Sequence, residues 1–181
     1  MNEYDARDIL LASEEIADAK TVQASLDRLG QEISDALHDR FPLVLPVMGG
    51  AIVFAGQLLP RLDFPLEFDY LHVTRYRGKT QGGAVEWRVL PGKSVAGRTV
   101  LVIDDILDEG ETLYAVRQKL LEMGAARVHT AVLADKDIQS KKPIQADFVG
   151  LKVPNRFVFG CGMDAYGLWR NLPEIRALKE E

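Results

Sequence analysis

The sequence predicts an α/β fold in which a parallel sheet is flanked by helices, and three observations predict it. The run 100–103 (VLVI) is apolar at every position, as is typical of a central parallel strand covered on both faces. Residues 112–123 then carry apolar side chains at helical spacing, and residues 128–134 are apolar again. This strand–helix–strand order indicates a βαβ unit, and a length of 181 residues with 47% hydrophobic side chains suits one domain.

The first 40 residues are expected to be helical. Residues 8–19 carry apolar side chains among acidic ones, and residues 21–38 place an apolar stripe on one side of a second helix. The stripe consists of Val22, Leu26, Leu29, Ile33 and Leu37. Thr21 is a suitable N-cap for this second helix, because its hydroxyl can accept a hydrogen bond from a free amide of the first turn.

The stretch 41–60 contains no charged residue, as a membrane span would require. Three prolines and the pair Gly49–Gly50 interrupt it, whereas a spanning helix needs about 20 continuous apolar residues. We therefore expect a buried strand over 43–48, a glycine turn and a buried helix over 51–59.

The remaining elements are shorter. Apolar and acidic residues alternate over 66–73, which predicts a strand with one wetter face, and 85–90 could pair with it as a hairpin. Beyond residue 147 only two short apolar runs remain, at 148–151 and 157–160.

The overall charge and the cysteine count exclude several classes of protein. The net charge of −5 gives no broad positive field for non-specific nucleic-acid binding. A single cysteine excludes an intrachain disulfide and a four-cysteine zinc site, and the acidic start is unlike a secretory signal. We expect a cytoplasmic protein with no membrane partner. His38, His72, His129 and Cys161 are expected to serve packing or the surface.

The most informative segment is an acidic loop that follows the central strand. Asp104 and Asp105 stand at the end of the apolar run, and Asp108, Gly110 and Thr112 follow just before a helix begins. Ligands bind at this edge of open α/β sheets, and amides at a helix N-terminus bind phosphate. Carboxylates suit ribose hydroxyls or a hydrated Mg²⁺. The loop is therefore predicted to hold a sugar phosphate; the alternative is an ordinary turn with acidic capping residues.

This loop resembles the phosphoribosyl-pyrophosphate (PRPP) loop of type I phosphoribosyltransferases, and most of all that of the hypoxanthine-guanine enzymes. Three further segments support the resemblance in the same order, namely 46–50 (PVMGG), 132–137 (VLADKD) and 147–164 (DFVGLKVPNRFVFGCGMD). The resemblance implies one domain over 1–181. Its sheet core would cover about 40–150, and a small hood would form from about 1–39 and 151–181.

The resemblance also implies roles for the loop residues. Asp104 and Asp105 would hold the ribose 2- and 3-hydroxyls and support Mg²⁺. Asp108 would be the general base that takes the proton from purine N7. The 5-phosphate would bind Glu109, Gly110, Glu111 and Thr112, with the two glutamate side chains turned to solvent.

Other family positions would recognise the purine and the metal. Lys136 would donate to the 6-oxo group, because an ammonium offers only donors and so rejects a 6-amino group. Phe157 would stack on the purine and the backbone of Val158 would bind its edge. Asp164 would ligate Mg²⁺, and Arg170 would contact pyrophosphate.

Pyrophosphate would also bind the backbone of Met48 and Gly49, where the family often has a cis peptide bond. Many members have lysine at the position of Met48, so one charge contact differs here. The charged loop 75–84 fits a lid that excludes water, with Arg75 and Tyr76 near its start.

The predicted activity is Mg²⁺-dependent purine salvage, which converts hypoxanthine or guanine plus PRPP to IMP or GMP and pyrophosphate. The alternative is a PRPP-sensing regulator that binds nucleic acid on the same fold; Asp108, Lys136 and the acidic balance argue against it. The segment 104–108 (DDILD) can also be read as the Asp-rich motif of prenyl-diphosphate synthases. In those all-helical proteins the motif lies on a helix, whereas here it follows the apolar run 100–103 and leads into Gly110, which argues against this alternative. The family likeness implies a homo-oligomer, either a dimer or a tetramer.

Overall fold

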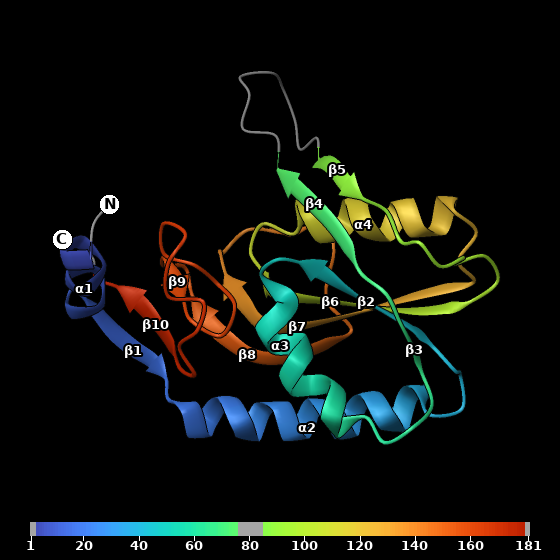
Figure 1. The fold of residues 1–181 in the computed structure, drawn as a ribbon, viewed down its shortest axis with the longest axis horizontal. Coiled ribbons are helices and arrows are strands. Elements are labelled where there is room, and N and C mark those ends of the chain that lie inside the picture. The colour runs from blue at the N-terminus through green and yellow to red at the C-terminus, as the bar shows by residue number, and fades with distance from the viewer. Residues whose placement is uncertain (1–2, 76–84, 180–181) are drawn as a thin grey trace.

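A mostly parallel sheet forms the centre of the computed structural model, which describes residues 3–75 and 85–179 (Figure 1). Within these residues the main sheet has seven strands in the order β5-β4-β2-β6-β7-β8, with β3 paired to β2. The strands are β2 (Leu43–Met48), β3 (Glu67–Phe68), β4 (Leu71–Arg75), β5 (Val85–Val89), β6 (Thr99–Leu107), β7 (Arg127–Asp137) and β8 (Phe148–Pro154). β5 runs antiparallel to β4, which confirms the predicted hairpin.

Helices cover both faces of this sheet (Figure 1). α2 (Ala19–Leu37) and α3 (Ala51–Leu58) share one apolar cluster with Leu101 and Ile103 of β6. α4 (Glu111–Glu122) shares a second cluster with Val100 and Val102 of the same strand. Successive side chains of a strand point to opposite faces, so the unbroken apolar run of β6 serves both layers, as predicted.

The order of the strands creates a switch point between β2 and β6. From β2 the chain passes through α3 to β4 on one side, whereas from β6 it passes through α4 to β7 and β8 on the other. Connections that leave two adjacent strands in opposite directions open a crevice at their carboxyl ends. The turn after β2 and the acidic loop after β6 therefore flank the same crevice.

The N-terminal region differs from the prediction. α1 (Glu3–Leu11) ends early, and residues predicted to continue a helix form the strand β1 (Ser13–Ala17). β1 pairs with β10 (Ile175–Leu178), which in turn pairs with β9 (Val158–Phe159), and these three form a second sheet. Pairing with a strand from the other end of the chain overrides the local helical pattern.

The second predicted helix is present as α2, and its apolar stripe is buried as expected. Its N-cap is Asp18 rather than Thr21: the Asp18 side chain accepts a hydrogen bond from the Thr21 amide at 2.7 Å. α2 packs against the main sheet, although its residues fall in the range predicted to form the hood. The division of the chain into core and hood stays a prediction. Among the described residues, no helix is both long and apolar enough to cross a bilayer.

Candidate functional site

A cavity of about 480 Å³ lies at the switch point, at the carboxyl ends of β2 and β6. Four segments line it: the end of β2 with the turn to α3, β4, the end of β6 with the start of α4, and the C-terminal segment. Predicted residues in its wall are Met48, Gly49, Asp104, Asp105, Asp108, Gly110, Thr112, Asp164 and Arg170. Residues from separate parts of the sequence thus meet at one cavity.

Asp104 and Asp105 lie inside β6, because this strand continues to Leu107 and does not end at residue 103 as the apolar run predicted. The Asp104 carboxylate accepts from the Asp105 amide at 3.0 Å, and that of Asp105 accepts from the Ile106 amide at 2.8 Å. Loss of contact with water raises the pKa of the Asp105 carboxyl, and a hydrogen bond with Asp104 opposes this rise. The pair is therefore a partly desolvated acceptor site.

The glycine turn approaches this carboxylate closely. A Cβ atom on Gly50 would stand 2.0 Å from Oδ2 of Asp105, so only glycine allows the contact. The peptide bond between Met48 and Gly49 is cis, as the family resemblance implied. The turn therefore places backbone groups, rather than side chains, against the carboxylates.

The loop after β6 leads directly into α4. Gly110 has φ +87°, a conformation that favours glycine, and α4 begins at the next residue. Gly110 and Thr112 line the cavity. Glu109 and Glu111 are exposed and line a separate surface cavity, so their side chains lie outside the site as expected. The helix N-terminus thus borders the first cavity, and the side chains of Glu109 and Glu111 are not part of its lining.

Asp108 and Lys136 contact one another across the ends of β6 and β7. Lys136 Nζ donates to Asp108 Oδ2 at 2.9 Å, and the lysine side chain is 13% exposed whereas that of Asp108 is 39% exposed. The structure thus joins the residue predicted as general base to the residue predicted as purine donor. A ligand that offers both an acceptor and a donor could engage both groups.

A second cavity of about 260 Å³ adjoins the first, and the two share Asp105, Ile106, Asp108 and Asp164. Lys136, Phe157, Val158 and Met163 complete its wall. Phe157 is 47% exposed, so part of its ring is accessible from this cavity. The cavity therefore offers an apolar ring and a lysine on the far side of Asp108.

Phe157 has an aromatic neighbour that the sequence did not predict, Tyr166. Tyr166 stacks on it with the ring centroids 5.6 Å apart and the planes inclined by 14°. Tyr166 does not line the second cavity, and its φ of +54° places it in a tight turn that the Asp164 side chain closes by accepting from the Gly167 amide. The spacing of Asp164 and Gly167, three residues apart, is a signal of this turn in the sequence.

The acid and the arginine predicted in the C-terminal segment form an ion pair. Arg170 Nη2 lies 2.6 Å from Asp164 Oδ1, and Arg170 Nη1 donates to the Gly162 carbonyl at 2.5 Å. Among the described residues, no three His, Cys, Asp or Glu side chains converge as a metal cluster. Carboxylate oxygens nevertheless suit Mg²⁺, which is commonly held by one or two carboxylates plus substrate phosphates. Asp104, Asp105 and Asp164, which line the first cavity, fit that pattern.

Two further predictions concern the rim of the first cavity. Arg75 is the last residue of β4, and Tyr76 lies outside the described residues, so the lid stays a prediction. His72, for which no functional role was expected, lines the first cavity because β4 pairs with β2 and brings it beside Met48.

Comparison with known proteins identifies the family of this chain. Residues 12–165 match the family model of the phosphoribosyl transferase domain. The hypoxanthine-guanine phosphoribosyltransferase of Bacillus subtilis is 36% identical over 180 residues, which cover 99% of this chain and 97% of that protein.

Solved structures are similar over the same length. A hypoxanthine phosphoribosyltransferase from Staphylococcus aureus has a TM-score of 0.87 at 30% identity and covers 99% of this chain and 96% of its own. The Trypanosoma cruzi enzyme in complex with the product IMP has a TM-score of 0.83 at 25% identity, covering 91% and 93%. The chain therefore belongs to the phosphoribosyltransferase family, in its hypoxanthine-guanine branch.

Proposed function

We propose that this chain transfers the phosphoribosyl group of PRPP to N9 of hypoxanthine or guanine, forming IMP or GMP and pyrophosphate. One observation carries the proposal: two adjoining cavities of different chemistry share Asp108 in their common wall. One cavity is lined by carboxylates and glycine backbone, and the other by an aromatic ring and a lysine. A sugar phosphate and a purine bound in the two would meet beside Asp108.

The first cavity suits the sugar phosphate. Asp104 and Asp105 would accept hydrogen bonds from the ribose 2- and 3-hydroxyls. The amides from Glu109 to Thr112, at the start of α4, would bind the 5-phosphate, helped by the positive end of the helix dipole. The ribose would thus be held at both ends, with C1 facing the second cavity.

The second cavity suits a 6-oxopurine. The purine would replace the contact between Asp108 and Lys136: its 6-oxo group accepts from Lys136, and its N7–H donates to Asp108. Phe157 would stack on the ring, and the backbone of Val158 would bind its edge. A 6-amino group offers Lys136 no comparable acceptor, so adenine is disfavoured.

The transfer step follows from these positions. The N9 lone pair forms a bond to C1, the bond from C1 to the pyrophosphate oxygen breaks, and the N7 proton passes to Asp108. Positive charge develops on the ribose, and the carboxylates beside it stabilise that charge. Proton transfer to a positioned carboxylate contributes about 10²–10⁴-fold in rate.

The leaving pyrophosphate would bind the backbone of Met48 and Gly49 and the side chain of Arg170, with Arg75 and Tyr76 closing over it. Asp104, Asp105 and Asp164 would hold Mg²⁺. When bound, Mg²⁺ supplies positive charge that offsets the charge of the phosphate groups. Arg170 contacts Asp164 and the Gly162 carbonyl, and its guanidinium has further N–H donors for pyrophosphate.

The experiment is a spectroscopic assay with PRPP and Mg²⁺ and, in turn, hypoxanthine, guanine, xanthine and adenine. We expect turnover with hypoxanthine and guanine and much slower turnover with adenine. The rate with xanthine shows whether a third 6-oxopurine is accepted. Binding of leader RNA or operator DNA without turnover of any base would instead identify a regulator.

Asp108→Asn tests the general base. Turnover should fall about 10²-fold or more, because the amide cannot take the proton, while PRPP still binds. PRPP affinity is measured separately by calorimetry. Turnover near that of the wild type would show that Asp108 is not the base.

Three properties outside the site complete the proposal. A cytoplasmic location is supported by the single buried Cys161, which has no disulfide partner in the chain. A homo-oligomer, dimer or tetramer, is supported by the family likeness and is tested by light scattering. A hood over the site is supported by the second sheet, whose strand β9 carries Val158.

A further inference from the structure

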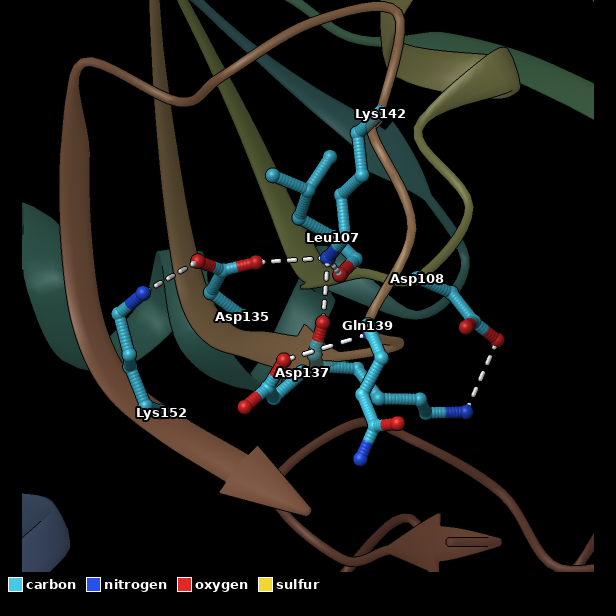
Figure 2. Close-up of polar contacts among 8 residues, drawn as sticks. Leu107, Asp108, Asp135, Asp137, Gln139, Lys142 and Lys152 are labelled. Carbon is cyan, nitrogen blue, oxygen red and sulfur yellow. Dashed lines mark hydrogen bonds and ion pairs between the residues drawn. The ribbon is translucent and has the colours of Figure 1, made fainter. Parts of the chain in front are cut away.

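Lys142 lies in the loop between β7 and β8, and its side chain is only 12% exposed. Its Nζ donates to the Leu107 carbonyl at 2.7 Å, to the Lys136 carbonyl at 2.6 Å and to Oδ1 of Asp135 at 2.7 Å. An ammonium has three N–H donors, so this set uses all of them. Figure 2 shows Lys142 descending from the loop to the place where Leu107 and Asp135 lie side by side.

Two of these three acceptors are backbone carbonyls at or next to Asp108 and Lys136, the two residues proposed to bind the purine. Leu107 directly precedes Asp108, and the other carbonyl is that of Lys136 itself. The pairing of β6 with β7 ends at Leu107 and Asp135. Lys142 therefore donates hydrogen bonds to both β6 and β7 at the point where the pairing of these strands ends.

A charged donor suits this position better than an apolar side chain. The Asp135 side chain is 19% exposed, and partly buried carboxylates and carbonyls need hydrogen-bond donors. The second cation beside Asp135 is Lys152, at 3.6 Å with an 80% exposed side chain. An ion pair with so exposed a lysine stabilises the structure little. The connection between the ends of β6 and β7 therefore depends on Lys142.

We infer that Lys142 is a positioning residue that sets the relative placement of Asp108 and Lys136. The inference rests on the proposed function, in which these two side chains bind opposite sides of one purine edge. Without Lys142 the ends of β6 and β7 lose their common hydrogen-bond donor, and the acceptor and donor for the purine move independently. The carboxylates that would bind the ribose lie earlier in β6, inside the paired part of the strand, and keep their places.

Lys142→Met tests this inference, because methionine has a similar length and no donor. We expect kcat to fall about 10²-fold, which is the scale of a 1 Å misplacement of reacting groups. The purine KM should rise and the ratio of hypoxanthine to adenine turnover should fall, whereas the KM for PRPP stays within about twofold. Lys152→Met is the matched control: it removes the other cation beside Asp135 and should leave all these values within about twofold.

The outcomes separate this inference from the proposed function. A wild-type protein that turns over neither hypoxanthine nor guanine refutes the function itself. With an active wild type, a Lys142→Met protein that keeps its kcat and its choice of base overturns the positioning role. If the KM values for PRPP and for purine rise equally, Lys142 only stabilises the fold, and this result would also overturn the positioning role. If Lys142→Met does not fold, Lys142→Gln replaces it, because glutamine keeps two donors on a shorter side chain. The same comparison then applies: the purine KM and the base preference should change, and the KM for PRPP should not.

Discussion

Replacement of Gly50 by alanine tests how closely the glycine turn controls the position of Asp105, which is proposed to bind the ribose. The new Cβ would stand 2.0 Å from Oδ2 and 2.6 Å from Cγ of Asp105. Because Cβ atoms keep about 3 Å from such neighbours, the carboxylate has to retreat by about 1 Å. That retreat also disturbs its 2.8 Å hydrogen bond with the Ile106 amide.

We expect Gly50→Ala to lower kcat/KM for PRPP about 10²-fold, since a misplacement of 1 Å in a binding constellation has effects of that size. The assay is initial velocity against PRPP concentration at saturating hypoxanthine, with thermal unfolding measured in parallel. Gly56→Ala in α3 is the matched control, because its Cβ meets nothing within 4 Å. A Gly50→Ala protein within threefold of the wild type would refute the claim that the turn fixes the position of Asp105.

Three further predictions address other parts of the site. Lys136→Gln should weaken the preference for 6-oxo over 6-amino purines, because the amide offers an acceptor as well as donors; an unchanged ratio of guanine to adenine turnover would remove this role. Tyr166→Ala should raise the purine KM about 2- to 10-fold through loss of the ring that supports Phe157, and Tyr166→Phe should restore it; equal KM values in all three proteins would contradict the stacking role. Burial raises the pKa of the Asp105 carboxyl above its ordinary 3.8, so ionisation of this group should lower the free energy of unfolding of the substrate-free protein as pH rises through that titration. Asp105→Asn should remove this part of the decline, as measured by urea unfolding across pH.

The parts of the fold that the sequence predicts best are those with local, periodic signals. The stripe of α2 repeats at helical spacing, and β6 is apolar at successive positions because it packs against helices on both faces. β1 was missed because its sequence, SEEIA, has no strand periodicity and its partner β10 lies at the far end of the chain. A short edge strand of this kind is determined by its partner rather than by its own residues.

The residues of the site also differ in how well the sequence predicts them. Asp108 and Lys136 were identified because each stands in a short motif, and the parallel sheet then brings the ends of their strands together. Tyr166 and Lys142 were missed because each makes its contact from an irregular loop, where no periodicity fixes the direction of a side chain. Loop conformation, which depends on distant hydrogen bonds, was the missing information.

The second sheet connects β1 and β10, which come from opposite ends of the sequence, to Val158 in the wall of the second cavity. Ser13 of β1 stands opposite Leu178 of β10, and Ala177 of β10 stands opposite Val158 of β9. Trimming the C-terminus back into β10 would therefore loosen β9, the strand that follows Phe157, while leaving Asp104 and Asp105 of the main sheet untouched. Protein engineers who truncate this enzyme should look for damage in base affinity before they look for it in PRPP affinity.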